Sequence, residues 1–159
     1  MTHISNNMAL RDPSQLAMLK ERLISQSVMS AEILRLLGAT ADARQGMAPT
    51  MRRHFDALVE AGAATDAALA LIDGALPGWK LRRLVYDDGE WHCALSQRRE
   101  LPDWLDEAAE GCHASRSIAL MLAVVEALGQ ASALRRGAGG AVPRAMPVHD
   151  GLICCENYT

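Results

Sequence analysis

The chain has 159 residues, of which 50% are hydrophobic and only 4% are aromatic, and its formal net charge is −3 at pH 7. This length fits one compact domain, and with so few aromatic side chains its core must consist mainly of aliphatic and alanine side chains, which favours helix packing. The slight acidity excludes electrostatic attraction of the whole molecule to nucleic acid or anionic lipid.

The sequence gives no indication of export or of a membrane segment. Residues 1–7 lack a basic stretch followed by an apolar stretch, so we expect no secretory signal and a cytoplasmic protein. The longest apolar run, Ile118 to Val125, is shorter than the roughly 20 residues that a membrane-spanning helix needs. The irregularly spaced cysteines predict no disulfide framework.

Composition divides the chain into four predicted parts. Residues 1–13 are polar and are expected to form a flexible N-terminus. Residues 14–46 carry leucines at three- and four-residue spacing, which predicts a helical extension. Residues 50–130 are expected to form an α-β-β-α module, and residues 131–159, rich in Gly and Ala, a disordered tail. The predicted fold class is therefore α+β, with a two-stranded antiparallel hairpin packed on helices and additional N-terminal helices.

The hairpin is predicted between Trp79 and Ser96. Pro77 ends the preceding helix because proline lacks the backbone N–H that a helix requires. A three-residue loop with Gly89 left-handed would place Val85 opposite Trp91. That register gathers most apolar side chains on one face: Trp79, Leu81, Val85, Trp91, Cys93 and Leu95. The alternative two-residue loop would separate the first two of these from Trp91, so we prefer the longer loop.

The segment from Ile118 to Leu128 is predicted to be a helix that is apolar on more than one side, with Glu126 as its only charge. Incomplete coverage of such a helix would leave a patch that binds a partner or a second copy. We therefore predict a partner-binding surface at Leu120, Val124 and Leu128, and keep a buried core helix as the alternative.

The order of elements in residues 64–130 resembles that of the phage ABA sandwich domain. The matching residues are Ala68, Leu71, Leu76-Pro77-Gly78-Trp79, Trp91, Ala94, and Ala119-Leu120 with Ala123. The resemblance implies a fold and a phage or prophage context, and it brings no assigned activity. The leading interpretation is a non-enzymatic protein without a cofactor that binds a protein partner or forms a homo-oligomer.

A second resemblance leads to a different function. Asp88-Gly89-Glu90-Trp91, followed by a strand and a helix with Ala119-Leu120 and Glu126-Ala127-Leu128, is similar to the HicB-type antitoxin pattern. This chain departs from that family at residues 110–115, where members usually carry a Gly-rich segment, and residues 137–159 supply no DNA-binding segment. The resemblance implies an antitoxin or a nucleic-acid-binding regulator as the alternative function.

A basic surface on the hairpin would serve this alternative. Cations would contact phosphates and an aromatic ring would stack on a base, as in proteins that bind single strands. A solvated face balanced by nearby carboxylates is the competing interpretation. The candidate nucleic-acid-binding residues are Lys80, Arg82, Arg83, Tyr86 and His92.

Two pairs of neighbouring residues, His92-Cys93 and Cys112-His113, consist of zinc-ligand types. Adjacent residues on a strand point to opposite faces, so His92 and Cys93 are poorly placed to hold one ion. We therefore predict no metal site, with Cys93 in the core and His92 on the surface. Sequence neighbours such as Cys112 and His113 also rarely align for proton transfer, so no nucleophile pair is expected.

The remaining candidates for chemistry are weak. The acidic residues Asp103, Asp106, Glu107 and Glu110 are the types that ligate hard metals or act as paired carboxylates, but such groups usually form a solvated face. An enzyme would need a pocket that His92, Tyr86 and Arg82 line together. We predict no catalytic residues.

Overall fold

The computed structural model describes residues 12–98, 100–102 and 105–137. These residues form helices and a three-stranded antiparallel sheet of order β1-β2-β3, which confirms the predicted α+β class. The helices are α2 (Pro13–Ile24), α3 (Ala31–Gln45), α4 (Pro49–Glu60), α5 (Ala64–Ala75) and α6 (Arg116–Gly137). The strands are β1 (Lys80–Asp87), β2 (Glu90–Ser96) and β3 (Ala109–His113).

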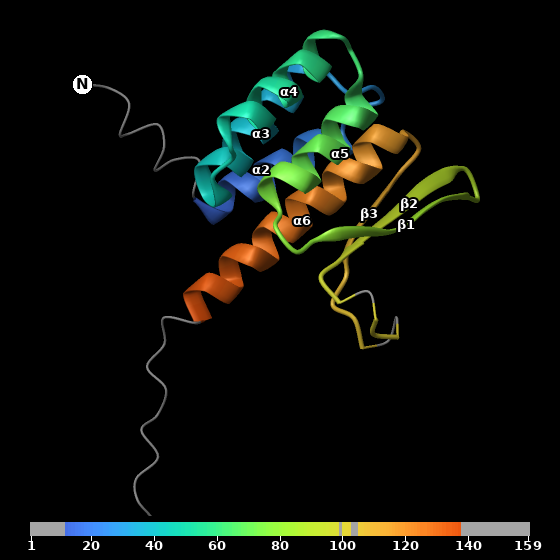
Figure 1. The fold of residues 1–159 in the computed structure, drawn as a ribbon. Coiled ribbons are helices and arrows are strands. Elements are labelled where there is room, and N and C mark those ends of the chain that lie inside the picture. The colour runs from blue at the N-terminus through green and yellow to red at the C-terminus, as the bar shows by residue number, and fades with distance from the viewer. Residues whose placement is uncertain (1–11, 99, 103–104, 138–159) are drawn as a thin grey trace, which may run out of the picture.

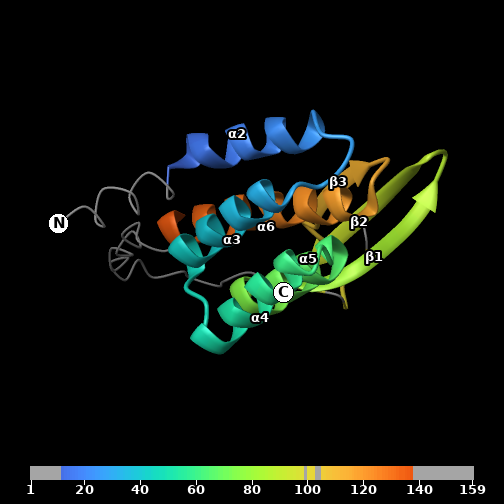
Figure 2. The same ribbon diagram turned by 90° about the horizontal axis from the view of Figure 1, so that it is seen from above.

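Helix α6 lies at the centre of the molecule, between the sheet on one side and α2 and α3 on the other (Figures 1 and 2). Helix α5 packs beside α6, and α4 packs on α3 and α5. One hydrophobic core joins these layers, with Leu19, Leu37, Leu71 and Leu128 all buried in it. The N-terminal helices are therefore packed on the rest of the fold.

The ends of the helices refine the predicted boundaries. Helix α2 begins at Pro13 and is capped by Asp12, whose carboxylate accepts a hydrogen bond from the Ser14 N–H at 3.0 Å. Helix α6 continues to Gly137, so the prediction of a disordered tail is wrong for residues 131–137. The rest of the predicted tail and most of the predicted flexible N-terminus lie outside the described residues.

The hairpin has a two-residue loop, and the predicted three-residue loop is wrong. Asp88 and Gly89 both have positive φ, 47° and 87°, as a tight loop between two twisted strands requires. Tyr86 therefore pairs with Trp91, and the predicted pairing of Val85 with Trp91 is wrong.

A bulge in β1 explains why this loop is compatible with a buried apolar face. The register shifts between Leu81 and Arg83, which inserts one extra residue into β1. Because side chains alternate along a strand, this residue restores Leu81 to the face of Cys93 and Leu95. Val85 lies between the bulge and the loop and pairs with His92, which places it on the face away from the core, where it is 43% exposed.

The third strand, β3, was not predicted, because residues 97–114 read as charged and turn-like. It pairs antiparallel with β2 and packs closely on α6. The closest approach is at Gly111, where a Cβ atom would meet the Ala119 carbonyl oxygen and lie 2.6 Å from the Ala123 nitrogen. Only glycine allows the strand to lie this near the helix backbone.

Burial explains the apolar composition of α6. The side chains of Leu120, Val124 and Leu128 are each 0% exposed. The prediction of a partner-binding surface at these residues is therefore wrong. They belong to a buried core helix, which was the alternative interpretation. By length and composition alone, residues 116–135 would also suffice to cross a membrane, but a buried core helix passes the same test.

Candidate functional site

Helix α6 packs on one face of the sheet, with the other helices on the same side, and we call the opposite face the outer face (Figure 1). Strand alternation assigns side chains to it, because residues two apart on a strand and residues paired across strands share a face. The outer face carries Arg83 and Val85 from β1, Glu90, His92 and Ala94 from β2, and Glu110 and Cys112 from β3.

Three of these side chains form a compact cluster on β2 and β3. Glu90 and His92 lie two residues apart on β2, and His92 pairs directly with Cys112 on β3. The Cys112 Sγ lies 3.1 Å from the Glu90 Oε2 and 3.9 Å from the His92 Nε2. One possible ligand atom from each residue lies within 4.8 Å of the others. We call these three residues the Glu90–His92–Cys112 cluster.

The hydrogen bond to the Glu90 carboxylate is the main influence on the thiol in this cluster. The hydrogen bond that Cys112 donates to the Glu90 carboxylate, together with burial and the negative charge of Glu90, raises the pKa of Cys112. A reactive cysteine requires the opposite shift, because the thiolate is the nucleophile. The free cluster therefore holds a protonated thiol, and its arrangement does not activate Cys112 for covalent catalysis.

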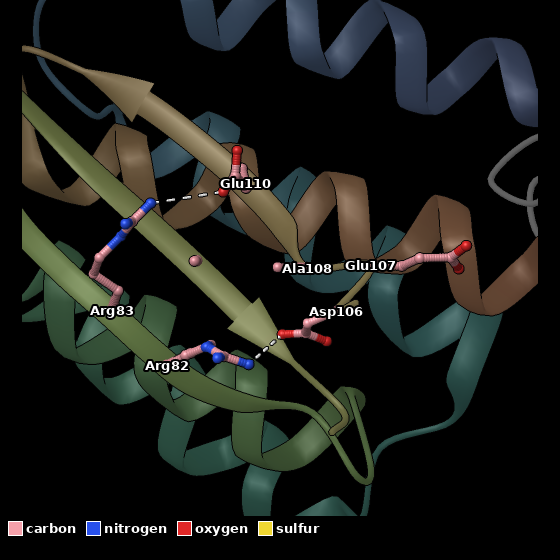
Figure 3. A pocket seen from close by; sticks show the side chains of 7 residues that line it. Arg82, Arg83, Asp106, Glu107, Ala108 and Glu110 are labelled. Atoms are coloured by element: carbon pink, nitrogen blue, oxygen red, sulfur yellow. Dashed lines mark hydrogen bonds and ion pairs between the residues drawn. The ribbon is translucent and has the colours of Figure 1, made fainter. Parts of the chain in front are cut away.

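A hollow of about 380 Å³ lies on the same face, next to the segment that precedes β3 (Figure 3). The Arg82 Nη1 lies 2.7 Å from the Asp106 Oδ2, and these side chains are only 20% and 5% exposed. Arg82 also donates to the Leu101 carbonyl oxygen at 2.8 Å. Across the hollow, Arg83 faces Glu110 at 3.7 Å. Each cation here is matched by a carboxylate, so the hollow has no excess positive charge.

The predicted basic surface is not assembled by the fold. Arg82 and Arg83 are engaged as described, and Lys80 lies 3.4 Å from Asp73. Tyr86 packs against Trp91 with the ring centroids 5.4 Å apart, and by register it shares a face with Trp91, while His92 lies on the outer face. The stacking residue and the cations therefore do not form one surface, and Arg82, Tyr86 and His92 do not line one pocket.

The described acidic residues that the sequence singled out, Asp106, Glu107 and Glu110, all line this hollow. Asp106 is paired with Arg82 and Glu110 with Arg83, and Glu107 points away from these ion pairs (Figure 3). Asp103 lies outside the described residues. The structure thus gives no paired carboxylates among the acidic residues that it describes.

The Glu90–His92–Cys112 cluster was missed because β3 was missed. His92 is adjacent to Cys93 in the sequence and Cys112 to His113, and the structure confirms that Cys93 is buried while His92 is on the outer face. Only the pairing of β2 with β3 brings His92 and Cys112 together. A weak signal was present in residues 109–112, where small and polar side chains alternate.

Comparison with known proteins adds no assignment. No family model, no curated protein and no solved structure matches the chain. The structure itself defines the class, an α+β protein in which helices cover one face of a three-stranded antiparallel sheet.

Thiol alkylation tests the electrostatics of the cluster. The chain has two further cysteines, Cys154 and Cys155, which are replaced by serine in this experiment so that only Cys93 and Cys112 remain. We then expect Cys112 to react and Cys93 to stay unmodified in the folded protein, because burial raises the pKa of Cys93 to about 12. Glu90→Gln replaces the carboxylate that accepts the Cys112 hydrogen bond and carries the nearby negative charge, both of which raise the pKa of Cys112. At pH 8 the thiolate fraction and the alkylation rate should therefore increase. Intact-mass spectrometry over time measures both rates; an unchanged or slower rate in E90Q would contradict the assigned cause.

Proposed function

We propose that this chain is a small non-enzymatic protein that acts by self-association, in which two copies pair along the free edges of their β1 strands. The resemblance of residues 64–130 to phage ABA sandwich proteins supports a phage or prophage context for this assembly. The single observation that carries the proposal is the order of charges and exposed side chains along β1.

Strand β1 lies at the edge of the sheet. Its backbone pairs with β2 on one side, and within the described residues no strand pairs with it on the other. An unpaired strand edge is a ready template for another strand, because its backbone donors and acceptors are otherwise satisfied only by water. The hairpin projects beyond the helices, so this edge is accessible over its distal half (Figure 2).

The side chains of β1 favour a second copy as the partner. A two-fold antiparallel pairing centred on Val85 places Arg83 opposite Asp87 of the partner subunit, and Leu84 opposite Tyr86 of the partner subunit. Val85, which is 43% exposed, would then face its own counterpart. The symmetric contact thus has an apolar centre flanked by two ion pairs. Arg83 can exchange Glu110 for Asp87 of the partner subunit, because its pairing with Glu110 is long, at 3.7 Å, and exposed, and such pairs are weak.

A charge exchange tests this register. We expect the parent to be a dimer by sedimentation equilibrium, and Arg83→Asp and Asp87→Arg each to weaken dimerisation at least tenfold, because each places like charges opposite one another. The double variant R83D/D87R restores opposite charges in a two-fold contact and should recover dimerisation. Val85→Lys should prevent it by placing two ammonium groups at the centre.

Two controls make the outcome decisive. Glu21→Lys changes an exposed charge on α2, far from β1 in sequence, and should leave the dimer unchanged. Nuclease treatment should also leave the dimer unchanged. Loss of the dimer on nuclease treatment would favour the nucleic-acid-binding alternative. A monomeric parent, or a double variant no better than the single variants, would overturn the proposal.

A further inference from the structure

We infer that the Glu90–His92–Cys112 cluster is a binding site for a single Zn²⁺ ion, held by the Glu90 carboxylate, the His92 Nε2 and the Cys112 Sγ. This inference goes beyond the proposed self-association. It uses β2 and β3, whereas the proposed contact uses the free edge of β1.

The distances between the donor atoms fit a tetrahedral ion. Ligand bonds of about 2.0–2.3 Å place neighbouring donors of a tetrahedral zinc site roughly 3.3–3.7 Å apart. The observed separations from the Cys112 Sγ, 3.1 Å to Glu90 and 3.9 Å to His92, lie on either side of that range. The side chains of Glu90 and Cys112 are exposed, so small rotations suffice to close the difference.

The backbone holds the three donors in place. Paired strands fix the separation of His92 and Cys112, and Glu90 follows by strand alternation. Gly111, the neighbour of Cys112, is packed against the backbone of α6, which anchors β3 at this point. A site built on rigid strands loses little conformational freedom when it binds an ion.

The donor set selects zinc and leaves one position open. Thiolate, imidazole and carboxylate together are typical of zinc rather than of Mg²⁺ or Ca²⁺, which prefer oxygen ligands. His113 does not complete the set, because it follows Cys112 on β3 and lies on the opposite face of the sheet, where its Nδ1 accepts a hydrogen bond from the Ser115 N–H at 2.9 Å. Cys93 is buried on the other face of β2. The fourth position faces solvent and would hold water. On binding, the Cys112 thiol loses its proton to solvent as the sulfur–zinc bond forms.

Cobalt spectroscopy and calorimetry test the site. In a C154S/C155S background, Co²⁺ should give a thiolate-to-metal charge-transfer band and intense visible bands typical of tetrahedral coordination. Zn²⁺ should displace Co²⁺ and bind with a stoichiometry of one ion per chain by titration calorimetry. Cys112→Ser should abolish the charge-transfer band, and E90Q and His92→Gln should each weaken zinc binding at least tenfold.

Matched variants separate a built site from general surface binding. Glu110→Gln removes a carboxylate two residues from Cys112 on the same face, and His54→Gln removes an exposed histidine on α4; both should bind zinc as the parent does. Circular dichroism should show that every variant is folded. Charge transfer that survives C112S, or losses in E110Q or H54Q equal to those in E90Q and H92Q, would overturn the inference, as would the absence of zinc binding by the parent.

Discussion

Replacing Gly111 with alanine is expected to lower the free energy of unfolding by about 3 kcal/mol, at the upper end of the usual cost of overpacking. The added Cβ would meet the Ala119 carbonyl oxygen and lie 2.6 Å from the Ala123 nitrogen and 2.9 Å from the Leu122 Cβ. Two of these atoms belong to the helix backbone, which cannot rotate away as a flexible side chain would. Relief therefore requires β3 to move off α6.

Gly129→Ala provides a matched control on α6 itself. A Cβ at Gly129 has ordinary van der Waals contact, 3.8 Å from the Leu16 Cδ1. Since glycine is an unfavourable residue inside a helix, this substitution should raise the free energy of unfolding by about 0.5–1 kcal/mol. Urea denaturation followed by circular dichroism measures both variants. If G111A cost no more than about 0.5 kcal/mol, the close packing of β3 on α6 would be wrong.

Leu120→Ala is expected to lower the free energy of unfolding by about 2–5 kcal/mol, and Leu120→Asp to prevent stable folding. Leu120 is 0% exposed and belongs to the hydrophobic core. Truncation leaves a cavity there, and aspartate places a charge in an apolar interior. Denaturant unfolding of L120A and the folded fraction of L120D measure the two effects.

Leu134→Ala is the corresponding change on the exposed side of the same helix. Leu134 is 61% exposed, so its truncation should change the free energy of unfolding by no more than about 0.5 kcal/mol. Equal effects of L120A and L134A would restore the idea that Leu120 lies on a binding surface. A larger loss of unfolding free energy in L120A than in L134A would instead show that Leu120 is a core residue. Any loss of partner binding in L120D would then result from unfolding.

The hairpin shows how a correct local pattern can support a wrong register. The turn at Asp87-Asp88-Gly89 and the apolar set around it are evident in the sequence, but the choice between two loops depended on perfect alternation in β1. The bulge between Leu81 and Arg83 breaks that alternation. One extra residue at this point returns Leu81 to the core face, which the local alternation of side chains does not indicate.

Sequence reasoning alone identified the helical content, the helix stop at Pro77, the hairpin and the α+β class, because caps, turn residues and hydrophobic spacing act over a few residues. It left open whether α6 was apolar because it is buried or because it binds a partner, since composition is the same in both cases. It also did not find β3 or the Glu90–His92–Cys112 cluster. Those depend on the pairing of β2 with β3 and on the fit of Gly111 against α6. Contacts between segments distant in the chain have no local periodicity, so only the tertiary structure decided them.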